Sequence, residues 1–96
     1  RTPTVLVVGS TVGDTDQRTA ENRDAVAAGV QNILLAAASL GLATYWGSCP
    51  KGANDAVAGL SGFEHDTFVS AIIYVGWATE SVAAPPRPPV VLGRID

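Results

Sequence analysis

The chain has 96 residues, enough for one small domain, and it is sparsely charged. Charged residues make up 16% of it and hydrophobic residues 47%, with a formal net charge of −3. This balance offers no basic face, so nucleic acid is not an expected partner. So few charges also indicate that something else covers part of the surface.

The sequence disfavours both membrane insertion and disulfide stabilisation. Residues 25–50 carry no charge, yet Gln31, Asn32 and Ser39 interrupt this stretch, and its apolar core is shorter than the ~20 residues that span a bilayer. Cys49 is the only cysteine, which excludes an intrachain disulfide and fits a reducing, cytoplasmic location. Arg1 opens the chain without a methionine or a signal-peptide pattern, so we expect the chain to begin inside a longer protein.

The first half of the chain predicts a strand followed by a long helix. Thr4–Gly9 is an apolar, β-branched run, which favours a strand buried on both faces. A polar loop over Gly13–Gln17 leads into a helix from about Ala20 to Leu40, and Gly41 is placed to end it. Apolar residues recur at helical spacing and define one face of this helix: Val26, Val30, Ile33, Leu34, Ala37 and Leu40. Alanines and Leu35 fill most of the rest, so neighbours are expected on more than one side.

The second half predicts a strand, a short helix and another strand. A strand is expected over residues 43–46, a helix over residues 53–60 and the strongest strand over residues 68–76. The order strand, helix, strand, helix, strand predicts an α/β or α+β fold.

An extended tail is expected after the last strand. Pro85–Pro89 must be extended and rigid, and Val90–Leu92 is placed either to add an edge strand or to dock elsewhere. We therefore expect a single domain over residues 1–96, with residues 80–96 as a proline-rich tail.

No group of residues in the chain forms a self-sufficient catalytic centre. Gly9–Gly13 lacks the spacing of a phosphate-binding or dinucleotide-binding loop, so it is interpreted as a turn that ends a strand. His65 stands between Glu64 and Asp66 without an evident second metal ligand and is interpreted as a surface residue. Cys49 lacks a histidine to activate it and is interpreted as a packing or loop residue. Any catalysis would therefore depend on a bound cofactor.

Two segments resemble the nitroreductase family. Asp24–Ala37 reads D-A-V-A-A-G-V-Q-N-I-L-L-A-A, similar to the family's core helix, in which an aspartate and small residues precede Q-N-x-L-L-A-A. Leu40–Trp46 is similar to the family's A-L-G-L-G-T-x-W. A short helix, an apolar strand ending at Gly76 and a proline-rich tail with Arg87 follow in the family's order. The resemblance covers nearly the whole chain and implies the C-terminal portion of a nitroreductase-like three-layer sandwich.

This resemblance implies an FMN-dependent oxidoreductase. In the family, NAD(P)H delivers hydride to FMN held at the interface of a homodimer, and the flavin then reduces a nitroaromatic, a quinone or a similar small-molecule acceptor. The family's N-terminal Arg-Ser-x-Arg segment, which grips FMN, is not in this chain. The chain is therefore expected to supply only part of the site, to need the missing N-terminal half, and to be inactive alone.

The resemblance also implies four cofactor-binding residues and no catalytic side chain. Trp46, Gly47 and Ser48 occupy the loop that approaches the flavin ring near N5 and O4, where a small residue permits close approach. Arg87 matches the basic residue that meets the FMN phosphate. A second basic residue common there is replaced by residues 84–86, Ala-Pro-Pro. Core packing is the alternative role for Trp46, and a solvated tail arginine is the alternative for Arg87.

Two other functions stay open at this point. One is a small non-catalytic α/β interaction module. The other keeps the fold but changes the reaction, because relatives with this architecture serve in cofactor biosynthesis, including flavin fragmentation and deazaflavin maturation.

Overall fold

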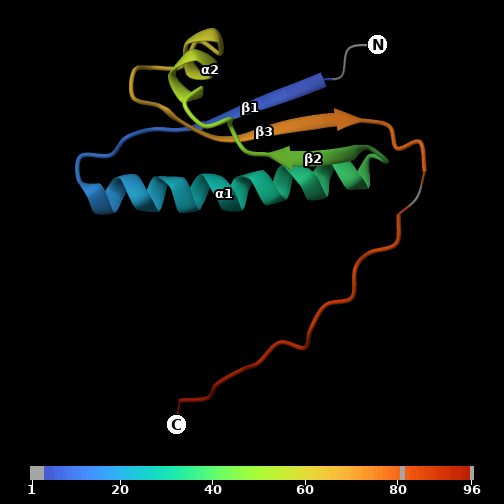
Figure 1. The fold of residues 1–96 in the computed structure, drawn as a ribbon. Helices are drawn as coiled ribbons and strands as arrows, with labels where there is room; N and C mark the ends of the chain where they lie inside the picture. Colours follow the sequence, from blue (N-terminus) through green and yellow to red (C-terminus); the bar gives the residue numbers. More distant parts are fainter. Residues whose placement is uncertain (1–3, 81, 96) are drawn as a thin grey trace.

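The mixed α/β order predicted from the sequence is confirmed. A computed structural model describes residues 4–80 and 82–95 (Figure 1). Its elements follow as β1 (Thr4–Ser10), α1 (Asp16–Ser39), β2 (Ala43–Gly47), α2 (Asn54–Leu60) and β3 (Phe68–Gly76). The expectations that concern residues 1–3, Ser81 and Asp96 lie outside the described residues.

The three strands form one antiparallel sheet in the order β1-β3-β2. The long helix α1 lies along one face of this sheet, and α2 lies on the other side, near the start of β3 (Figure 1). The prediction that β1 is buried on both faces is wrong. β1 is an edge strand, and Thr4, Val5 and Leu6 are exposed. A continuous apolar run does not show whether a strand is central or at an edge, and this is why burial on both faces was wrongly predicted for β1.

The core lies between α1 and the sheet. Val30 of α1 and Ala71 and Ile73 of β3 are fully buried, and the partly buried residues packed against them are Val8, Val26, Ile33, Leu34 and Val75. The predicted apolar stripe of the helix is therefore the face that meets the sheet. Leu40 is the exception: the helix ends at Ser39, and Leu40 is exposed. Gly41 has a φ of +78°, as expected for a residue that stops a helix.

A β-bulge in β3 changes which face of the sheet its side chains occupy along the strand. Val8 pairs with Ala71, whereas Gly9 pairs with Val69, so Ser70 is one residue too many. Side chains alternate along a strand, and the extra residue therefore shifts which face each segment of β3 presents. A Cβ on Gly9 would lie 2.6 Å from the Thr67 methyl and 3.0 Å from the Phe63 ring. The loop after α2 thus packs against the backbone where only glycine fits.

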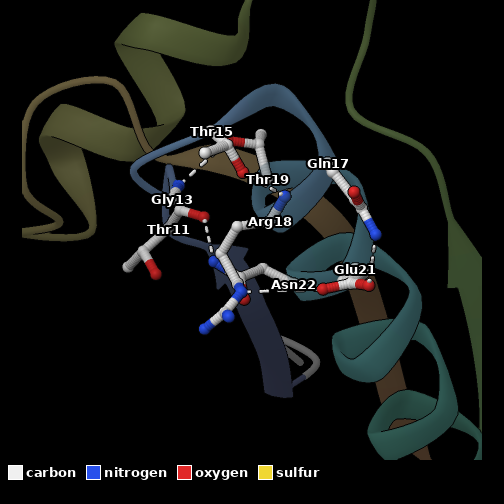
Figure 2. Close-up of polar contacts among 8 residues, drawn as sticks. All are labelled: Thr11, Gly13, Thr15, Gln17, Arg18, Thr19, Glu21 and Asn22. Carbon is white, nitrogen blue, oxygen red and sulfur yellow. Dashed lines mark hydrogen bonds and ion pairs between the residues drawn. The ribbon is translucent and has the colours of Figure 1, made fainter.

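Side-chain hydrogen bonds start α1 at Asp16, four residues before the predicted Ala20. Thr15 is the N-cap, and its hydroxyl accepts from the Arg18 N–H at 3.0 Å. Two contacts tie the preceding loop to the helix: Gly13 N–H donates to the Thr19 hydroxyl at 2.9 Å, and the Asn22 amide donates to the Thr11 carbonyl at 3.1 Å (Figure 2). The first turns are polar, so apolar spacing could not locate this start.

The tail leaves the body of the protein. Val90–Leu92 forms no strand and is exposed. Figure 1 shows the tail leading away from the sheet, and the radius of gyration is 16.5 Å, against about 12.5 Å for a compact domain of this length. Within residues 4–80 and 82–95, no helix is both long enough and apolar enough to cross a membrane.

Two glycine substitutions test the packing at the start of α1 and on the exposed side of α2. A Cβ on Gly13 would lie 2.4 Å from Cγ and 2.6 Å from Cβ of Arg18, so Gly13→Ala is expected to lower the free energy of unfolding by about 1–3 kcal/mol. Gly59 lies on the exposed side of α2 with nothing within 4 Å of its Cβ position. Gly59→Ala is therefore expected to raise that free energy by about 0.5–1 kcal/mol. Urea unfolding followed by circular dichroism measures both, and equal effects would contradict the geometry.

Candidate functional site

The predicted flavin loop lies at the end of β2. Trp46 pairs with Ile73 across the sheet, so its side chain lies on the face that packs against α1. The tryptophan is 38% exposed. It therefore contributes to packing at the sheet edge while keeping part of its ring accessible, and the structure is compatible with either role proposed for it.

Gly47 is buried, although it is the last residue of the strand. It pairs with Ile72, and a Cβ built on it would lie 3.4 Å from the rings of Tyr45 and Tyr74 and from the Ile72 carbonyl oxygen. These are ordinary contact distances, so alanine fits here without a clash. The two tyrosine rings, whose centroids are 6.2 Å apart, cover Gly47 on the face away from α1. Ser48, which follows, is exposed.

The loop from Ser48 to Ala53 has a defined conformation. Ala53 N–H donates to the Pro50 carbonyl at 3.0 Å, and Gly52 has a φ of +82°. This combination is typical of a type II turn, in which the third residue requires a positive φ and is usually glycine. Cys49 is partly buried, and Lys51 supplies a cation. Next to the loop lies a pocket of about 270 Å³, lined by residues 48–52, Asn54 and residues 68–70.

Asn54 connects this loop to the central strand. Its Oδ1 accepts from the Val69 N–H at 2.8 Å, and its Nδ2 donates to the Thr67 carbonyl at 3.0 Å. This role of Asn54 was not predictable from the sequence. The only local signal was the position of an asparagine near a helix start, because the partners lie 13 and 15 residues further along the chain.

The remaining candidates lie apart from the loop. Arg87 is exposed in the tail, which leads away from the sheet, so the structure does not bring it to Trp46–Ser48 (Figure 1). His65 is a surface residue, as predicted, and lies 3.2 Å from the Asp66 carboxylate. No group of three or more potential metal ligands occurs in the part of the chain that the structure describes.

Comparison with known protein families identifies the chain. The model of the nitroreductase family matches residues 1–77. The chain belongs to the nitroreductase family. Neither the curated proteins nor the solved structures compared with it gave a match. The matched segment contains the five helices and strands of the described residues together with Trp46, Gly47 and Ser48, and it ends before Arg87. Family membership indicates an oxidoreductase, while the flavin-binding roles of the four residues stay predictions.

Gly47→Ala separates the structural role of this glycine from a binding role. Because the new methyl meets only ordinary contacts, we expect the free energy of unfolding to change by less than about 1 kcal/mol. If the flavin ring approaches this backbone, FMN affinity falls about tenfold or more, equivalent to about 1.4 kcal/mol. Gly76→Ala, at a position in β3 with nothing within 4 Å, is the matched control: it should leave FMN affinity unchanged and raise the free energy of unfolding by no more than about 1 kcal/mol. Calorimetric FMN titration in the presence of the N-terminal half and urea unfolding of the chain measure the two effects, and unchanged FMN affinity in Gly47→Ala would count against close approach.

Proposed function

We propose that this chain supplies part of the active site of an FMN-dependent oxidoreductase, in which NAD(P)H reduces FMN and the reduced flavin transfers hydride to a nitroaromatic, a quinone or a similar acceptor. The family match over residues 1–77 is the observation that carries the proposal. FMN, when bound, supplies the hydride chemistry, and the protein binds and orients it.

In this proposal the chain contributes backbone N–H groups and one cationic side chain to the flavin site. The N–H groups of Gly47 and Ser48 hydrogen-bond the flavin ring in this proposal, and the ordered loop after β2 supports this role because it gives the backbone a defined course there. The Arg87 guanidinium matches the geometry of a phosphate group. To reach the site, the tail must fold back or extend to a second copy, since it leads away from its own sheet (Figure 1).

The exposed surface supports a second copy and a further part of the family domain as partners. The accessible surface is 7842 Å², whereas a folded monomer of 9.8 kDa exposes about 5200 Å². The outer side of α1 contributes to this excess with uncharged residues: Ala28, Gly29, Gln31, Asn32, Leu35 and Ala36. Depletion of charged residues is typical of the centre of an interface. We propose that a second copy covers this side of α1 and that the missing N-terminal half covers the exposed tyrosine face of the sheet.

Flavin binding is the first test of this proposal. The purified chain is mixed with FMN, with and without the N-terminal half that carries the Arg-Ser-x-Arg segment, and is then separated from free flavin by gel filtration. We expect flavin absorption to elute with the protein when both halves are present, and NAD(P)H to bleach it. A colourless protein under these conditions would reject the flavin function and favour the non-catalytic interaction module, which the same exposed apolar surface supports.

Two charge substitutions test the proposed dimer. Leu35 on the outer side of α1 and Val12 in the loop before it are similarly exposed, at 59% and 57%. Leu35→Glu buries an unpaired charge if a second copy lies on α1, so the dimer should weaken by about 3 kcal/mol or more. Val12→Glu is the control and should leave the dimer intact. Sedimentation equilibrium gives the association constants, and equal constants for the two variants would exclude this interface.

A further inference from the structure

Asn54 takes the place of a strand residue beside β3. The pairing of β2 with β3 ends where Gly47 meets Ile72. Beyond that point β2 has left the sheet, and the side-chain amide of Asn54 bonds the backbone of β3 instead. Its two partners, the Thr67 carbonyl and the Val69 N–H, flank Phe68, the first residue of β3.

This contact depends on the chemistry of a carboxamide. An asparagine side chain presents an acceptor and a donor side by side, as a peptide group does. The acceptor meets the Val69 N–H at 2.8 Å and the donor meets the Thr67 carbonyl at 3.0 Å, and both bonds are partly buried. An aspartate of the same shape would keep the first bond and lose the second, because a carboxylate only accepts.

The contact fixes the far end of the predicted flavin loop. At its near end the loop is held by the last β2 pair, Gly47 with Ile72, and in its middle by the turn from Pro50 to Ala53. Asn54, the first residue of α2, follows Ala53 directly and hydrogen-bonds the central strand. The loop from Ser48 to Ala53 is thus attached at both ends to the same strand, β3.

We infer that Asn54 is a positioning residue for the flavin: it does not touch the cofactor but fixes the course of the loop that begins at Ser48, and with it the direction of the Ser48 backbone N–H. This inference rests on the proposed function. Donors that are already oriented need no reorganisation when the flavin binds or is reduced. Without the Asn54 contact, part of the free energy of FMN binding is used to order the loop, and FMN affinity falls. The backbone N–H groups of the loop then also stabilise the reduced ring less well.

Four proteins in the presence of the N-terminal half test the inference: the unchanged chain, Asn54→Ala, Asn54→Asp and Ser61→Ala. Asn54→Ala should lower FMN affinity about tenfold or more and shift the flavin reduction potential to a more negative value. Asn54→Asp should lie between Asn54→Ala and the unchanged chain. Ser61→Ala removes a hydrogen bond at the other end of the same helix, from the serine hydroxyl to the Val57 carbonyl, and should change neither quantity.

The outcomes separate this inference from the proposed function. If Asn54→Ala binds FMN with the affinity and potential of the unchanged chain, the inference is wrong and the flavin function stands. If the unchanged chain binds no FMN, both fail. Amide hydrogen exchange in the flavin-free chain adds a readout independent of the cofactor: Val69 and the loop residues should exchange faster in Asn54→Ala, and unchanged protection overturns the inference. Should Asn54→Ala not fold, Asn54→Asp carries the same comparisons.

Discussion

The packing of Val30 against Ala71 and Ile73 is the contact on which the rest of the structure depends. These fully buried side chains join the longest helix to the central strand, and the other partly buried apolar residues gather around them. Because β3 has a strand on each side, whatever fixes β3 also fixes β1 and β2. The predicted flavin loop follows β2 and returns to β3 through Asn54. The position of this loop is therefore set indirectly by the same core, through its attachment to β3.

Only one layer of packing is complete in the described chain. One side of α1 meets the sheet, and the other side is open to solvent together with Tyr45 and Tyr74 on the far face of the sheet. Burial of apolar area is the main source of folding free energy, so open faces of this kind leave a small domain with a narrow margin. Folding is then expected to be coupled to formation of the proposed dimer and to completion of the proposed flavin site.

Periodic features were predictable from the sequence, and long-range polar contacts were not. The apolar strength of Phe68–Gly76 predicted β3 with its correct bounds, and Gly41 marked the end of α1. The start of α1 was placed too late because Thr15 and Thr19 act through hydrogen bonds, which leave no apolar period. The family motif located the loop after β2, whereas the Asn54 contact depends on residues that only the folded chain brings together.

Ser70 shows how a single residue determines which changes β3 can tolerate. The bulge brings Ala71 and Ile73 under α1 while Val69 pairs with Gly9, opposite the loop that follows α2. A substitution at Ser70 leaves this phase intact, since the position has no pairing partner to lose. A deletion of Ser70 would place Val69 directly before Ala71, so that the pairs Val8–Ala71 and Gly9–Val69 would form a regular ladder with their side chains on the same faces. The extra residue at position 70 thus sets the local bend and twist of β3, while the pairs on either side of it set which face each side chain meets.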